Sequence, residues 1–274
     1  MFKQREAIIR LLKDEDQDTV NLTKQQLAEG GTETIPDLKD LLAVDDQRVT
    51  THVREILSEI EVREAKVAFE EICLRISTPT ELELACWHLS QVFLPSVDIE
   101  PYRKTIDLWG DELRERLRSS QSDTARVMTM SQFFARNLGF RGNSDNYYNV
   151  RNSLLPTVID SKLGIPISLS LLYMIVAERA GVQVEGVNLP GHFVVRHGDV
   201  LFDPFHEGRI LTTRDCADIL ATQKLTLHMS HLQTATPKLI LMRILANLSY
   251  IFEDAEDEVP HQMVIRWIRL LDPK

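Results

Sequence analysis

Hydrophobic positions recur every three or four residues over the first half of the chain, the spacing typical of helices that bury one face. Prolines at 79, 95 and 101 punctuate this pattern, and the glycine of NLGF (137–140) ends it. The turn-rich sequence RGNSDNYYN (141–149) predicts a loop, with a short helix after it. The helices expected from this pattern lie at about 62–76, 80–93, 101–119, 122–138 and 149–161.

The first sixty residues contain two similar stretches, LLKDEDQDTVNLTKQQLAE (11–29) and LLAVDDQRVTTHVREILSE (41–59). When the two stretches are aligned at a spacing of 30 residues, leucine, aspartate, glutamine and glutamate occur at matching positions in both. Each copy predicts the end of one helix, an acidic turn and a second helix. Helical pairs of this kind bury a shared face by stacking, so the pattern favours a HEAT-like segment over 1–62. Two unrelated amphipathic helices are the alternative.

The pattern changes in the second half of the chain. SKLGIPISLSLLYMIVAERAGV (161–182) predicts an apolar helix, with Pro166 suited to its first turn and Gly181 to its end. After it, hydrophobic residues alternate with a period of two, which is typical of strands. Helices, a small antiparallel sheet and further helices together predict a mostly helical α+β fold. The strands are expected at 182–189, 192–197 and 200–203, and the last helices near 213–224 and 237–272, with a break in the acidic loop EDAEDE (253–258).

Composition restricts the possible partners. The 274 residues are 43% hydrophobic and 26% charged, as in ordinary globular proteins, and the net charge of −10 argues against nucleic acids or anionic membranes. The amino-terminal residues show no apolar signal-peptide core, and the longest apolar stretch is too short to span a bilayer. Cys73, Cys86 and Cys216 have no paired spacing, which favours a reducing compartment. We therefore expect a cytoplasmic protein that binds neither nucleic acid nor membrane; its oligomeric state stays open.

The stretch LPGHFVVRHGDVLFDPFHEGRIL (189–211) contains a candidate catalytic pair, His192 and Asp203. If Gly198 and Asp199 form a two-residue turn, Asp203 faces Val194 across the hairpin. His192 is then its diagonal neighbour on the same face, at a Cα separation of about 7–8 Å. In catalytic triads such an aspartate accepts a hydrogen bond from the histidine ring and orients it.

A nucleophile for this pair is harder to find. The apolar helix offers Ser168 and Ser170 in its first turns, where the helix dipole favours a nucleophile, but no cysteine. Both serines could equally be small residues in tight packing. Cys73 and Cys86 have apolar neighbours typical of inert core thiols, and Cys216 follows the aspartate near a helix start, so none is a natural candidate.

A metal site is a further alternative, because five possible ligands fall within sixteen residues. Strand alternation points His197 away from His192, and no pair has a familiar zinc spacing. The chain also lacks a phosphate-binding glycine motif. We therefore expect neither a metal nor a cofactor. The five residues are His192, His197, Asp203, His206 and Glu207.

Four segments of residues 133–208 carry a family resemblance: NSLL, LGIPISLSLLY, GVNLPGHFVV and FDPFHEG. They resemble the bacterial transglutaminase-core-like family of the Sir-B type, a domain that also occurs in some eukaryotic F-box proteins. The resemblance extends more loosely back to about residue 80. Forward, LILMRILANLSYIF is similar to the tetratricopeptide-like tail of many members.

This resemblance implies a papain-like transglutaminase core, in which a buried helix carrying the nucleophile packs on a small antiparallel sheet. His192 and Asp203 match the family's histidine and aspartate, and the nucleophile's place falls at about Ser168, where true transglutaminases have cysteine. The domains expected are a HEAT-like segment (1–62), the core with its preceding helices (63–228) and a tetratricopeptide-like tail (229–274).

Two functions follow from these expectations. The missing cysteine and the flanking helices favour a non-catalytic or catalytically impaired module that binds a protein or peptide. The alternative is a hydrolase or acyl-transferase acting on peptide or amide bonds through Ser168, His192 and Asp203. In that case Asn188, or backbone N–H groups near the start of the helix, would stabilise the oxyanion.

Overall fold

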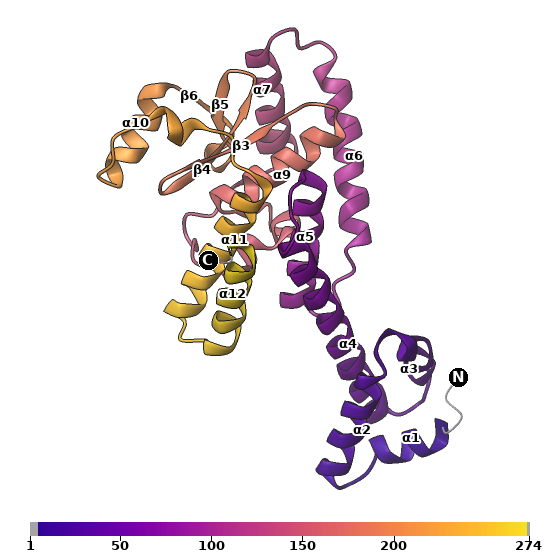
Figure 1. The fold of residues 1–274 in the computed structure, drawn as a ribbon. Helices are drawn as coiled ribbons and strands as arrows, with labels where there is room; N and C mark the ends of the chain where they lie inside the picture. The colour runs from indigo at the N-terminus through magenta and orange to yellow at the C-terminus, as the bar shows by residue number, and fades with distance from the viewer. Residues whose placement is uncertain (1–4, 273–274) are drawn as a thin grey trace. The chain divides into compact units, whose positions relative to one another are not determined.

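The computed structural model describes residues 5–272, and it divides the chain into two compact units (Figure 1). The first unit comprises Met1–Phe69 and His88–Val97, and the second comprises Glu70–Trp87 and Asp98–Lys274. Within the described residues, no helix is long and apolar enough to cross a membrane.

The first unit is helical and shows two similar helix starts. The side chain of Asp16 accepts hydrogen bonds from two N–H groups in the first turn of α2, and Asp46 does the same for α4. These caps lie 30 residues apart, as the sequence pattern does, while the HEAT-like classification stays a prediction. The elements are α1 (Arg5–Leu12), α2 (Gln17–Glu29), η1 (Gly31–Thr34), α3 (Ile35–Leu41), α4 (Gln47–Cys73) and α5 (Pro79–Phe93), the last two of which also enter the second unit.

Helix α4 differs from expectation, because it runs without a break where two shorter helices were predicted. Its residues 47–73 contain neither glycine nor proline, so nothing interrupts the backbone hydrogen bonding.

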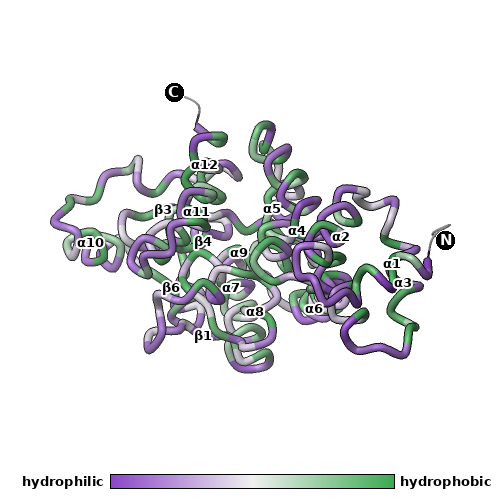
Figure 2. The backbone as a smooth tube through the Cα atoms, turned by 90° about the horizontal axis from the view of Figure 1, so that it is seen from below, coloured by the Kyte–Doolittle hydropathy of each residue, from purple (hydrophilic) through white to green (hydrophobic). Residues whose placement is uncertain are grey.

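The second unit contains the remaining helices. Helix α9 is buried along nearly all of its length, and Figure 2 shows it as mostly hydrophobic. Helices α11 and α12 lie side by side (Figure 1). The helices are α6 (Glu100–Leu117), α7 (Asp123–Gln132), η2 (Phe133–Asn137), η3 (Val150–Ser153), α8 (Leu155–Ser161), α9 (Pro166–Arg179), η4 (Pro204–His206), α10 (Thr213–Thr222), η5 (Met229–Leu232), α11 (Pro237–Asp254) and α12 (Glu258–Leu271).

The main sheet is a four-stranded antiparallel meander in the order β3-β4-β5-β6, and a two-residue parallel pair, β1 and β2, lies apart from it. The predicted hairpin register is confirmed: His197 pairs with Val200 and Val195 with Phe202. The fold is thus α+β and mostly helical, as expected. The strands are β1 (Arg141–Gly142), β2 (Leu163–Gly164), β3 (Glu185–Leu189), β4 (His192–His197), β5 (Val200–Asp203) and β6 (Arg209–Leu211).

The two faces of this sheet are covered by different helices. On one face, the ring of Phe202 lies 6.0 Å from that of Tyr173 on α9, which in turn stacks on Phe134 at 3.7 Å. Such aromatic pairs add about 0.5–1.5 kcal/mol to the area they bury. Side chains of the other face, Val187, Leu189 and Val194 among them, form a cluster with residues of α10.

Candidate functional site

His192 and Asp203 lie at adjacent strand ends, as the first residue of β4 and the last of β5. Nε2 of His192 donates a hydrogen bond to Oδ2 of Asp203 over 2.7 Å, so the contact expected from hairpin geometry is present. The Asp203 side chain is 2% exposed and that of His192 is 13% exposed. The histidine is therefore the member of the pair that an incoming molecule can reach, with Nδ1 left free of the aspartate.

Asp203 has two further hydrogen-bond donors, both in the turn that follows β5. Nδ1 of His206 lies 2.7 Å from the same oxygen, Oδ2, and the N–H of Phe205 donates to Oδ1 over 3.0 Å. Burial raises the pKa of Asp203, but the hydrogen bonds and charges of His192 and His206 outweigh burial and hold this pKa below its ordinary value. The carboxyl group is thus an ionised acceptor that holds the His192 ring in place.

The pair borders a cavity of about 440 Å³, which we call the His–Asp cavity. Alternation along β4 places His192 on the same face of the sheet as Val194, the face on which α10 packs. Helix α10 accordingly supplies the opposite wall of the cavity, including Asp215 and Asp218.

Ser168 has a structural role at the start of α9. Its hydroxyl accepts a hydrogen bond from the N–H of Ile165 and donates one to the carbonyl of the same residue, each over 3.1 Å. The residue is 2% exposed, and a Cβ placed on Gly164 would lie only 2.8 Å from its oxygen. The hydroxyl is therefore enclosed and bonded to its own helix start, and no hydrogen bond joins it to His192.

The other nucleophile candidates are also enclosed. Ser170 is 0% exposed, and its hydroxyl has no hydrogen-bond partner. Burial raises the pKa of the thiol of Cys73 to about 12 and also raises the pKa values of Cys86 and Cys216. A thiol with a raised pKa is a poor nucleophile at neutral pH, because little of it is ionised.

Asn188, the expected oxyanion residue, lies on β3 opposite Phe193. The next pair along, Leu189 with His192, must point to the opposite face by strand alternation. The side-chain oxygen of Asn188 is buried without a hydrogen-bond partner. Its side chain therefore points away from the face that carries the His–Asp pair.

His192, Asp203 and His206 also have the right chemistry for a metal site, since their ligand atoms lie within 4.8 Å of one another. Imidazole and carboxylate ligands suit zinc and other divalent transition metals. In this arrangement Nε2 of His192 and Nδ1 of His206 are both hydrogen-bonded to Oδ2 of Asp203. A metal would have to displace those protons, so its binding would weaken as the pH falls. His206 was named as a possible ligand but not as a partner of Asp203; its position three residues after the aspartate, in a turn, was the signal for that role.

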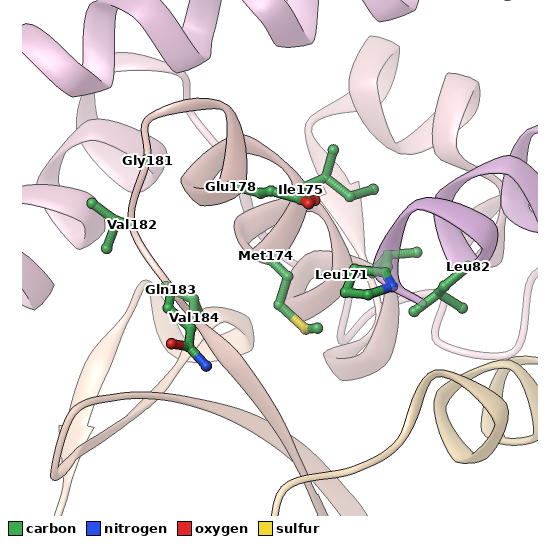
Figure 3. A pocket seen from close by; sticks show the side chains of 10 residues that line it. Leu82, Leu171, Met174, Ile175, Glu178, Gly181, Val182, Gln183 and Val184 are labelled. Carbon is green, nitrogen blue, oxygen red and sulfur yellow. The ribbon is translucent and has the colours of Figure 1, made fainter. Parts of the chain in front are cut away.

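Two of the other cavities in the second unit bear on the site. One, of about 280 Å³, is mostly apolar and lies beside the carboxyl-terminal half of α9, with Leu82, Leu171 and Met174 in its wall (Figure 3). None of the predicted site residues lines it. The other, of about 260 Å³, is lined by Gly191, which also borders the His–Asp cavity, and by Arg243 of α11. Sequence reasoning missed Arg243.

Comparisons with known proteins identify the family of the chain. A family model described as the transglutaminase-like superfamily matches residues 100–246, which include His192, Asp203 and Arg243. No solved structure shows a significant match to the chain.

Curated relatives are similar over part of the chain. A UPF0162 protein of Pseudomonas aeruginosa is 33% identical over 191 residues, covering 67% of this chain and 68% of its own length. A UPF0162 protein of Xylella fastidiosa (strain Temecula1) is 29% identical over 59% of this chain and 61% of its own length. F-box only protein 21 of Mus musculus is 37% identical over 40% of this chain, but over only 19% of its own length. The chain thus spans about three fifths of the length of the first of these relatives, those of Xylella fastidiosa.

Proposed function

This chain belongs to the transglutaminase-like superfamily, and from that premise we propose that it is a peptide- or protein-binding module without acyl-transfer chemistry. The resemblance implies that His192 and Asp203 match the family's pair and that serine, at about Ser168, replaces the nucleophilic cysteine. The proposal includes a cytoplasmic location, supported by three buried cysteines that form no disulfide.

The observation that carries the proposal is the environment of Ser168. A nucleophilic serine needs a base within hydrogen-bond reach and an open approach for the substrate. The Ser168 hydroxyl has both of its hydrogen bonds with Ile165 and is almost fully buried. To attack a carbonyl group it would have to break both bonds and leave its site in the helix start.

The His–Asp cavity supports a binding role. Its walls combine carboxylates, the His192 ring and the apolar side chains of Leu211 and Ile219. A mixture of apolar wall and a few placed polar groups is typical of ligand sites. Asp203 fixes the orientation of His192, so the ring presents its free nitrogen to an occupant at low entropic cost.

The intact hydrogen bond between His192 and Asp203 is also the one observation that favours the alternative, a hydrolase or acyl-transferase with a Ser168–His192–Asp203 triad. In that mechanism His192 would take the proton of Ser168 as a general base, and Asp203 would stabilise the resulting imidazolium.

Selection of random peptides on the immobilised full chain, followed by mass spectrometry of each bound peptide, tests the proposal against the alternative. We expect enriched peptides that bind in the micromolar range, are recovered at their original mass, and bind more weakly to His192→Ala. Peptides recovered cleaved or acyl-transferred, with that reaction lost in His192→Ala, would establish the alternative. Failure to enrich any peptide would refute the binding role.

A further inference from the structure

The cavity that contains Arg243 lies beside the His–Asp cavity, and we call it the arginine cavity. Its wall includes Tyr147, Tyr148, Gly191, Arg243, Asn247 and Tyr250. Gly191 immediately precedes His192 and borders both cavities. A molecule in the arginine cavity therefore contacts the residue that immediately precedes His192.

Arg243 supplies the only charge in this wall. None of the residues lining the arginine cavity is acidic, although the protein as a whole carries a net charge of −10. The residues three and four positions away from Arg243 on α11 are also uncharged: Leu239, Ile240, Ala246 and Asn247. The neighbouring turns of the helix thus provide no carboxylate to pair with this guanidinium.

One nitrogen of Arg243 also lacks a hydrogen-bond partner. Its Nε is buried and has no hydrogen-bond acceptor, and none of its nitrogens forms an ion pair with a residue that the structure describes. A buried N–H group without an acceptor destabilises a fold, so each one calls for an explanation. An anionic occupant would supply the acceptor that the protein does not.

The remaining walls are built to hold a fixed shape. Asn247 and Tyr250 follow Arg243 by four and seven positions, which places all three on one face of α11. Across from them, the loop that carries Tyr147 is held by Asn152, whose amide donates to the Tyr147 carbonyl over 3.0 Å. The rings of Tyr148 and Tyr250 lie 5.0 Å apart, so the loop meets the helix through aromatic side chains.

We propose that the arginine cavity is a subsite for a carboxylate group of the bound peptide. This proposal rests on the proposed binding function and names the chemistry that the site selects. A guanidinium presents a planar fork that matches one carboxylate with two parallel hydrogen bonds, and a single positive charge balances a single negative one. The volume of about 260 Å³ suits a group the size of one residue rather than a larger ligand. The next part of the peptide would then continue past Gly191 into the His–Asp cavity.

Matched probes that differ only in charge test this subsite. N-acetyl-phenylalanine carries a terminal carboxylate, and N-acetyl-phenylalaninamide replaces it with a neutral amide. N-acetyl-glutamate 1-amide carries the carboxylate on its side chain, with N-acetyl-glutamine amide as its neutral match, and this second pair distinguishes the two sources of the group in a peptide. We expect the full chain to bind one of the two acids roughly tenfold more tightly than its own neutral match in calorimetric titration.

Variants of Arg243 then locate the effect. Arg243→Met should reduce the preference for the acid to about one, Arg243→Lys should keep part of it, and the control Arg269→Met, which removes an exposed arginine of α12, should leave it unchanged. Circular dichroism and unchanged binding of the neutral amide show that each variant is folded. Equal binding of each acid and its neutral match to the wild-type chain, no binding of any probe at millimolar concentration, or a preference that survives in Arg243→Met would overturn the subsite. If the selection enriches peptides that share no carboxylate, the subsite is refuted but the proposed binding function is not.

Discussion

Replacing Ser168 with alanine should destabilise the second unit although it removes only one oxygen atom. The change deletes both hydrogen bonds to Ile165 and leaves the buried N–H of that residue without an acceptor. Loss of a helix cap costs about 0.5–2 kcal/mol, and a buried donor without a partner costs about 1–3 kcal/mol. These contributions overlap, since they describe the same group, so we expect a loss of about 1–3 kcal/mol.

Ser170→Ala is the matched control, because Ser170 lies two residues further along α9 and is equally buried. Its hydroxyl has no hydrogen-bond partner, so its removal relieves an unsatisfied polar group. We expect Ser170→Ala to change the free energy of unfolding by less than about 0.5 kcal/mol, or to increase it.

Urea denaturation followed by tryptophan fluorescence measures both variants. All three tryptophans, Trp87, Trp109 and Trp267, belong to the second unit, so the signal reports on the unit that contains α9. With a slope of about 2–3 kcal/mol per molar urea, Ser168→Ala should lower the midpoint by roughly 0.3–1.5 M. A Ser168→Ala midpoint equal to that of Ser170→Ala would refute the capping role, and with it the reason for excluding Ser168 as a nucleophile.

The remaining predictions concern the ionised groups of the second unit. Asp203→Asn should cost about 1.5–3 kcal/mol in the same urea assay, because hydrogen bonds to a charged acceptor are lost; an unchanged midpoint would contradict the role of Asp203 as an ionised acceptor. Because the folded-state pKa of Asp203 is below its unfolded value, its contribution is fully present above about pH 4 and is lost as the pH falls through the folded value. Acid unfolding of the wild-type chain should therefore be steeper than that of Asp203→Asn, and equal slopes would show that this carboxyl group does not contribute. Glu83→Gln should cost about 3 kcal/mol, since the buried Glu83 accepts from Arg179 through both oxygens. Glu178→Gln, which removes an exposed carboxylate 3.9 Å from the same arginine, should cost less than about 1 kcal/mol; similar costs for these two changes would refute the importance of burial.

The hairpin and its histidine–aspartate contact were predictable because strand alternation and the Gly198–Asp199 turn determine which side chains share a face. Helix α9 was predictable from its continuous apolar run and from the positions of Pro166 and Gly181 at its two ends. Strands β1, β2 and β6 have two or three residues each, too few to show a period of two.

The role of Ser168 was harder to predict, because its position near a helix start suits a nucleophile and a cap equally well. Only the path of the chain before α9 decides between them, by placing the N–H and carbonyl of Ile165 within reach of the hydroxyl. Arg243 was missed because an arginine in an amphipathic helix usually faces solvent. Its spacing from Asn247 and Tyr250 marks one face of α11, but the loop that covers this face comes from a distant part of the sequence.

The central claim is that the His192–Asp203 pair has no nucleophile to activate, and intact-protein mass spectrometry after exposure to a fluorophosphonate tests it most directly. The native chain at neutral pH should keep its unmodified mass, while a serine hydrolase in the same reaction is fully labelled. A single adduct on Ser168 that disappears in His192→Ala would contradict the account and establish a working triad.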